Sequence, residues 1–241
     1  MALPKIETPR YELEIPSTGV KTTYRPYLVK EEKILMMAME SDDNNQMASA
    51  LKDVVRACVD DTVDVDHLAM FDLEYIFTQL RAKSVGEATR ISVDCSSCKE
   101  KNEIMVDLSS VYIHNENGFK VQNIQLTDDV GITMKYPSVD AVMKTQRSGN
   151  NKKKNSDIDQ VFDLIMSCMD SIYSGDEIFD TNEQSKEEVN EFLESLNSEQ
   201  FGRIQSFIED MPQATIDVNY QCSSCGEQNN FSVRGLSNFF G

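Results

Sequence analysis

The chain has 241 residues, which is enough for one sizeable domain or two small ones with a buried core. Hydrophobic residues make up 40% and charged residues 27%, a composition typical of globular proteins and not of disordered chains. Asp and Glu outnumber Lys and Arg by 41 to 23, giving a formal charge of −18. This charge disfavours nucleic-acid binding, because cationic contacts to phosphate provide much of that affinity.

The sequence carries no pattern of a targeting or membrane segment. Its N-terminal stretch lacks the apolar core of a signal peptide, and no apolar run approaches the length that spans a bilayer. We therefore expect a reducing, cytosolic environment. There, CxxC pairs are more often metal ligands than disulfides.

Periodicity predicts that the first part of the chain forms a hairpin followed by three helices. The expected ranges are 11–27 for the hairpin and 28–40, 47–58 and 66–86 for the helices. Residues 30–33 should lie on the solvent side of the first helix. We favour a core position over an interface for its Met-rich segment 34–39. Cys58 falls on an apolar helical face and is expected to be a buried, inert thiol.

The middle of the chain is predicted to hold strands, then a loop, then helices. Strands are expected within 119–136, and a mobile polar loop with three lysines is expected over 145–156. A helical face follows from Ile158 to Ile172, with Cys168 on its apolar side. Ser185 and Glu188 form a capping box for the next helix, and Ser198 is expected to cap a last one.

Two CxxC motifs, Cys95–Cys98 and Cys222–Cys225, dominate the candidate chemistry. Aligned at a constant offset of 127 residues, the segments 95–106 and 222–233 are identical at 7 of 12 positions, including Asn102 with Asn229. Each copy is interpreted as a strand, a tight turn with two cysteines, and a second strand. Each copy offers only two ligands, so neither is complete without the other.

Four thiolates form the ligand set of a closed, structural zinc site, and we assign Cys95, Cys98, Cys222 and Cys225 as its ligands. An iron–sulfur cluster shares this ligand set. A thioredoxin-like redox pair fits less well, because it requires one CxxC in a strand–helix context. The site would join segments separated by 123 residues. Neither His67 nor His114 belongs to a recognisable catalytic pattern, so no enzyme is predicted.

These patterns predict a single α+β domain over 1–241, with helices around a small sheet. Its sheet would include a split zinc ribbon, with halves at 89–108 and 214–236.

Four segments also carry a resemblance to a known family. They read IPSTGVKTTYRPYLVKEEKILMMAMES, EQFGRIQSFIEDMP, CSSCG and GLSNFF. Together they resemble the baseplate hub proteins of T-even-type contractile-tailed bacteriophages. The resemblance implies a non-enzymatic structural or assembly role, with other tail or baseplate proteins as partners. It places the protein in the virion tail baseplate, or in the host cytoplasm during assembly, and implies no catalytic residues. The terminal Phe239 and Phe240 could anchor a partner or pack on the protein's own core.

The competing interpretation is a zinc-ribbon adaptor in nucleic-acid or transcription complexes. Such an adaptor needs a basic or aromatic surface, which the charge of −18 opposes. A metal-dependent or thiol enzyme would need an open coordination position or an activated cysteine.

Overall fold

The computed structural model describes residues 6–41, 43–115, 118–119, 121–149 and 157–235. It has an α+β fold and divides into two compact units. Unit 1 comprises Met1–His114 and Pro212–Gly241, and unit 2 comprises Asn115–Met211. The sequence predicts one domain, whereas the central segment has a hydrophobic core of its own in the structure.

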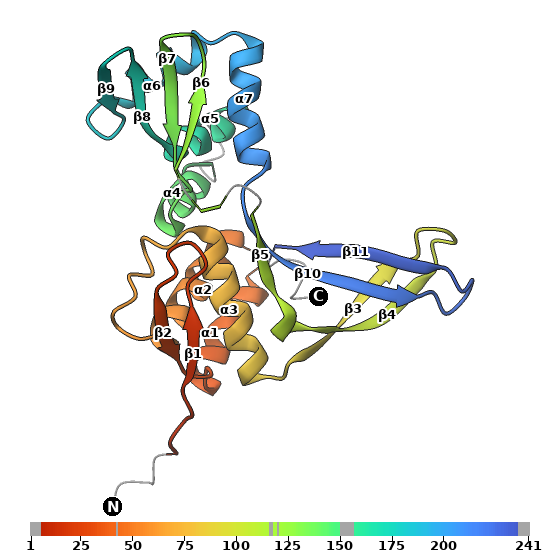
Figure 1. Cartoon of the computed structure of the whole chain (residues 1–241). Helices are drawn as coiled ribbons and strands as arrows, with labels where there is room; N and C mark the ends of the chain where they lie inside the picture. Colours follow the sequence, from red (N-terminus) through yellow and green to blue (C-terminus); the bar gives the residue numbers. More distant parts are fainter. Residues whose placement is uncertain (1–5, 42, 116–117, 120, 150–156, 236–241) are drawn as a thin grey trace, which may run out of the picture. The chain divides into compact units, whose positions relative to one another are not determined.

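Unit 1 begins with the predicted hairpin and three helices. Its elements in Figure 1 are β1 (Tyr11–Glu14), β2 (Lys21–Tyr24), α1 (Val29–Glu40), α2 (Asn44–Cys58), α3 (Met70–Ser84), β3 (Ala88–Asp94), β4 (Lys101–Asp107), the 3-10 turn η1 (Leu108–Ser110), β5 (Tyr112–His114), β10 (Gln213–Gln221) and β11 (Gln228–Arg234). Helix α3 starts four residues later than predicted, because a turn in which the His67 amide donates to the Asp64 carbonyl precedes it.

The core of unit 1 centres on α3, which is apolar on more than one side. Its four fully buried large side chains are Leu73, Ile76, Phe77 and Leu80. Helix α2 adds Val54 and Val55, and the hairpin adds Leu13, which alternation along β1 turns inward. Burial on several sides explains why α3 shows little amphipathic contrast in sequence.

The prediction that residues 30–33 face solvent is wrong for Glu31. This carboxylate is only 2% exposed, and it lies 2.9 Å from the Arg25 guanidinium. It also accepts the Leu28 amide at 2.8 Å, which caps the start of α1. The Met-rich segment 34–39 is only partly buried. Leu35 and Ala38 are buried, and the exposed residues are Ile34, Met36, Met37 and Met39.

Unit 2 packs helices against one four-stranded antiparallel sheet. Its elements are β6 (Gln122–Gln125), β7 (Val130–Met134), α4 (Val139–Gly149), α5 (Asp157–Cys168), β8 (Met169–Ser174), β9 (Glu177–Asp180), α6 (Lys186–Glu194) and α7 (Ser198–Glu209), with strand order β6-β7-β8-β9. Ile132 and Met134 from the sheet pack with Ile165, Leu193 and Ile204 from the helices. This unit therefore has a hydrophobic core of its own.

Several boundaries in unit 2 differ from the sequence predictions. The helix expected to reach Ile172 ends at Cys168, because the chain from Met169 onward pairs with β7 as strand β8. Residues 145–149 of the expected loop belong to α4, and residues 150–156 with the three lysines lie outside the described residues. The Ser185 capping box is confirmed. The following helix is capped by Asn197, one residue before the predicted position.

Candidate metal centre

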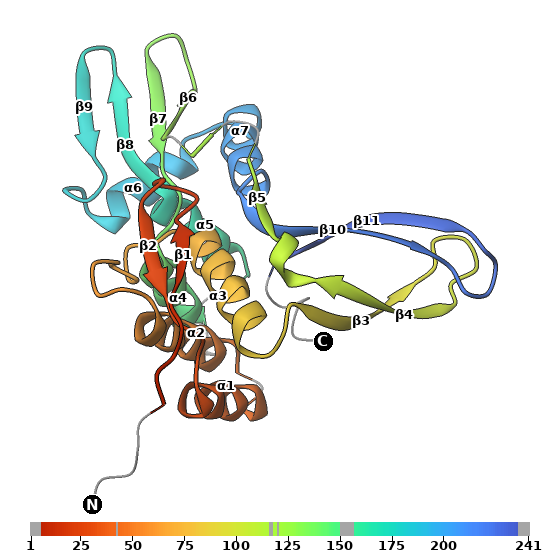
Figure 2. The same ribbon diagram turned by 60° about the horizontal axis from the view of Figure 1, so that its bottom comes forward.

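The internal repeat of the sequence appears in unit 1 as two matching β-hairpins. In the first, β3 pairs with β4 from Ala88↔Asp107 to Asp94↔Lys101. In the second, β10 pairs with β11 through the equivalent residues, from Thr215↔Arg234 to Gln221↔Gln228. Figures 1 and 2 show the two hairpins side by side, with their turns at the same end. The turns carry the two CxxC motifs.

This arrangement brings the four predicted ligands together. The sulfurs of Cys95 and Cys225 are 3.7 Å apart, and so are those of Cys98 and Cys222. All four ligand atoms lie within 4.8 Å of one another. A regular tetrahedral site with zinc–sulfur bonds of ~2.3 Å puts neighbouring sulfurs ~3.8 Å apart. The donor set and its spacing therefore fit a four-thiolate metal ion.

Each CxxC turn is held by the same pair of backbone hydrogen bonds. The Cys95 amide donates to the Glu100 carbonyl at 2.9 Å, and the Lys99 amide donates back to Cys95 at 3.0 Å. The second turn repeats both bonds from Cys222. Both turns need a left-handed residue, which is Gly226 in one and Lys99, at φ 60°, in the other. The lysine carries a conformational cost that the glycine avoids.

Asn102 connects the first hairpin to the turn of the second. Its side-chain carbonyl accepts from both the backbone amide and the hydroxyl of Ser223, each at 3.0 Å. Its amide nitrogen donates to the sulfur of Cys222 at 3.5 Å and to the Glu100 carbonyl at 2.9 Å. The side chain is only 6% exposed, so these bonds satisfy an otherwise buried amide.

Asn229 makes the reciprocal connection from the second hairpin. Its carbonyl accepts from the amide and hydroxyl of Ser96 at 2.9 and 2.8 Å, and its nitrogen donates to the sulfur of Cys95 at 3.5 Å. We call Asn102 and Asn229 the asparagine pair. Each member orients a cysteine of the opposite turn, as partners beyond the ligands do in metal sites.

The groups around the four sulfurs lower the pKa of two cysteines and raise the pKa of the other two. The pKa of Cys222 is lowered to about 6, chiefly because the backbone amide of Cys225 points at its sulfur. The pKa of Cys95 is lowered in the same way by the amide of Cys98. Although the Glu100 amide favours the thiolate of Cys98, the neighbouring thiol groups, that of Cys225 foremost, raise its pKa to about 12. Each turn thus holds one cysteine whose surroundings favour the thiolate, which is the form that binds metal.

The remaining cysteines and the histidines lie outside this cluster. Cys58 and Cys168 are buried, and burial raises the pKa of each to about 11, in agreement with inert thiols. His67 is exposed beside Asp64, and His114 lies in strand β5. Among the described residues, the four cysteines form the only cluster of three or more groups that could hold a metal.

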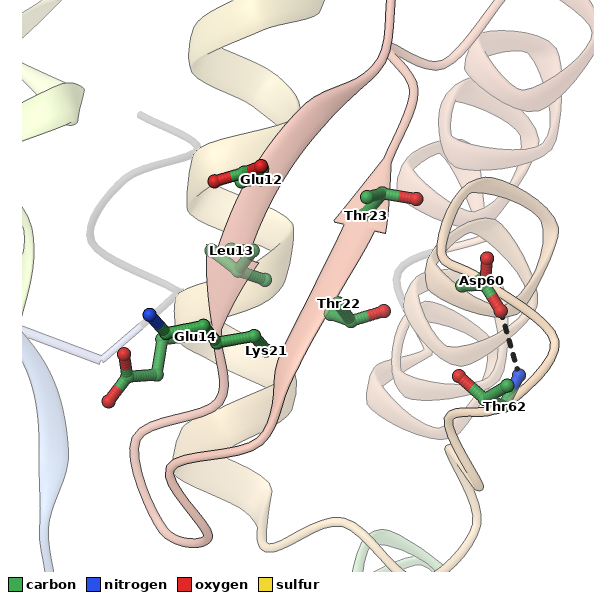
Figure 3. A pocket seen from close by; sticks show the side chains of 8 residues that line it. All are labelled: Glu12, Leu13, Glu14, Lys21, Thr22, Thr23, Asp60 and Thr62. Carbon is green, nitrogen blue, oxygen red and sulfur yellow. Dashed lines mark hydrogen bonds between the residues drawn. The ribbon is translucent and has the colours of Figure 1, made fainter.

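Unit 1 also has an open pocket of about 690 Å³ between the β1–β2 hairpin and the turn after α2 (Figure 3). It is lined by Glu12, Leu13, Glu14, Lys21, Thr22, Thr23, Asp60 and Thr62. The Asp60 carboxylate accepts the Thr62 amide at 3.2 Å, as the dashed line in Figure 3 marks. Seven of its eight lining residues are polar or charged, and none is a histidine or a cysteine.

A family model described as T4 bacteriophage base plate protein matches residues 8–241, almost the whole chain. The chain belongs to this family. No curated protein and no solved structure matches it. The predicted resemblance to phage baseplate proteins is therefore confirmed, at the level of a T4-type baseplate protein. In the described part of this baseplate protein, no helix has the length and apolar character needed to cross a bilayer.

Proposed function

We propose that this protein is a non-enzymatic hub component or assembly factor of a T4-type phage baseplate. It acts through contacts with other tail proteins, and a structural zinc ion joins its two hairpins. Membership of the baseplate family supports the tail role. The observation that carries the metal assignment is the convergence of four sulfurs within 4.8 Å at the ends of two matching hairpins.

The ligands in this proposal are Cys95, Cys98, Cys222 and Cys225, and the two hairpins form the halves of a split zinc ribbon. When bound, zinc supplies four metal–thiolate bonds that fill its coordination sphere, so the site is structural. The asparagine pair orients the sulfurs of Cys95 and Cys222, and the backbone amides of the two turns favour the thiolate form of these cysteines. Two cysteines are exposed, which leaves a path for the metal to enter.

Elemental analysis tests the metal. Protein purified without added metal should contain about one zinc per chain, and Cys222→Ser should lose it. Cys58→Ala, which changes a cysteine outside the cluster, should keep it. A chain that binds no metal, or that carries iron with inorganic sulfide and visible absorption, would overturn the zinc assignment.

Hydrogen exchange after exhaustive chelation tests the structural role. Amides of β10 and β11 should exchange faster once the metal is removed, while those of the β6–β9 sheet, in unit 2, should not change. Unchanged exchange in both regions would show that the metal does not stabilise the fold.

Tail assembly tests the hub role. A phage that lacks this gene should produce no infectious tails, and the wild-type gene supplied in trans should restore them. Mass spectrometry of purified virions then separates a permanent component from a transient assembly factor. Normal baseplates without the protein would refute the proposal. No observation favours the nucleic-acid adaptor, which an electrophoretic shift with DNA or RNA would support.

A further inference from the structure

Unit 2 contains an apolar groove that its own described elements leave open. The groove has a volume of about 380 Å³ and lies between the sheet and helix α6. Its lining residues are Val130, Ile172, Ser174, Phe179, Gln184, Glu188, Val189 and Phe192. Most of the lining is apolar, and the groove is independent of the cysteine cluster, which lies in unit 1.

Strand pairing explains how the groove forms. Phe179 of β9 lies directly opposite Ile172 of β8, which in turn lies opposite Ile132 of β7. These side chains share one face of the sheet, the face that carries the core of the unit. Val189 of α6 is 6% exposed and belongs to that core, whereas Phe179 remains 40% exposed. The groove is thus an accessible extension of the hydrophobic core.

The segment that supplies seven of the eight lining residues is acidic, and we call its carboxylates the acidic border. Between Asp170 and Glu194 the chain has nine Asp and Glu residues and a single basic residue, Lys186. That lysine lies 2.6 Å from Asp163. All four residues of β9 are exposed, and β9 pairs only with β8, so it is an edge strand of the described sheet. An apolar floor within an acidic border is complementary to a cationic, amphipathic partner.

We propose that this groove is a docking site for a basic amphipathic segment of another protein. Its apolar side chains enter between Phe179 and Phe192, and its Lys or Arg side chains pair with the surrounding carboxylates. A second copy of this chain is a poor occupant, because every copy carries a charge of −18. The exposed Phe179 provides the aromatic anchor typical of protein interfaces.

Peptide binding to the full-length protein tests the chemistry of the partner. The probes are a fluorescein-labelled peptide of alternating Leu and Lys, a Ser/Lys version without apolar side chains, and a Leu/Glu version of opposite charge. Fluorescence anisotropy should show that the Leu/Lys peptide binds at least ~10-fold more tightly than either of the others. Bound peptide should protect amides of β9 and α6 from hydrogen exchange.

Variants with matched controls locate the site. Phe179→Ser should weaken binding of the Leu/Lys peptide by about tenfold or more, because it removes the exposed apolar anchor. Ile178→Ser is its control: Ile178 is 75% exposed on the same strand, but alternation places it on the opposite face. It should leave the affinity unchanged.

Charge reversal tests the acidic border. Glu177 lies on the same face of β9 as Phe179, and Glu191 lies one helical turn after Glu188. The double variant Glu177→Lys/Glu191→Lys should weaken binding by about tenfold at low salt and reduce its salt dependence. Glu12→Lys/Glu103→Lys changes the net charge equally in unit 1 and should have little effect.

Three results would overturn the proposal. One is equal affinity for the Leu/Lys and Leu/Glu peptides, and another is unchanged affinity in a folded Phe179→Ser protein. The third is concentration-dependent self-association in sedimentation experiments that Phe179→Ser abolishes, because a second copy would then occupy the groove.

Discussion

Removal of the asparagine pair is the most direct test of how the two hairpins are joined. Asn102→Ala deletes two hydrogen bonds to Ser223, one to the Cys222 sulfur and one to the Glu100 carbonyl. A typical hydrogen bond contributes about 1 kcal/mol net, and a buried group left without a partner adds about 1–3 kcal/mol. Because the four bonds belong to one side chain and such contributions are not additive, we expect Asn102→Ala to lower the free energy of unfolding by about 2–4 kcal/mol.

The assay must separate this effect from a general loss of stability. Thermal unfolding should be measured with and without metal, and zinc affinity by competition with a coloured chelator. Asn102→Ala should weaken zinc binding by about 10- to 100-fold, the usual effect of changing a residue that orients a ligand. Asn102→Asp keeps the acceptor for Ser223 but sets a carboxylate against the Cys222 sulfur. Its zinc affinity should fall although its bonds to Ser223 remain.

Asn230 provides the matched control. It follows Asn229 in strand β11 but is exposed, so Asn230→Ala should change stability by less than ~0.5 kcal/mol. Asn229→Ala should behave as Asn102→Ala does, because its contacts are reciprocal. If Asn102→Ala and Asn230→Ala have equal stability and equal zinc affinity, the asparagine pair does not join the hairpins and our interpretation is wrong.

Three further predictions follow from individual residues. Lys99→Gly should stabilise the protein by about 1 kcal/mol in chemical denaturation, because glycine adopts the left-handed backbone conformation without strain. Gly226→Ala should destabilise it by about 1 kcal/mol for the same reason. If both variants are as stable as the wild type, the backbone argument is wrong. Glu31→Ala should cost about 3 kcal/mol, because it leaves the Arg25 charge without its partner and removes the cap of α1; a loss below ~1 kcal/mol would show that the pair is effectively solvated. Burial raises the pKa of Asp72, so its charged form destabilises the folded state at neutral pH. Asp72→Asn should therefore raise the melting temperature at pH 7, and this gain should shrink as pH falls through the raised pKa towards the ordinary carboxyl range; a gain independent of pH would refute it.

The cysteine cluster was predictable because its signal is local and repeated. Two CxxC motifs within a repeat of constant offset require two equivalent hairpins, and the hairpins have equivalent registers. The shared asparagine at 102 and 229 was visible in the alignment. The role of this asparagine was not visible, because its bonds to the sulfurs join residues 120 and 134 positions apart.

Other features depend on partners that periodicity does not reveal. The sequence predicts Glu31 at the surface, because charged residues of a helix usually lie there, but its carboxylate is buried and pairs with the partly buried Arg25, six positions earlier. Met169 and Ile172 continue the helical spacing of Ile165 and Cys168, so sequence alone extends the helix. Residues from Met169 onward form a strand because they pair with β7. Their apolar spacing alone is compatible with a helix or a strand.

The division into two units was hidden for a related reason. No shift of composition marks the junctions, and the order of strands and helices is compatible with one α+β domain. Only the separate core of residues 115–211 reveals the second unit.

The pairing of β5 with β10 has a consequence for how this chain can be rearranged. His114, the last residue of β5, lies opposite Gln213, the first of β10, and the whole of unit 2 is inserted between these two positions. The ends of the insertion are thus fixed as neighbours by a short antiparallel ladder. This ladder predicts that a tight turn in place of residues 115–212 would leave a continuous hairpin, with the four cysteines still in one unit.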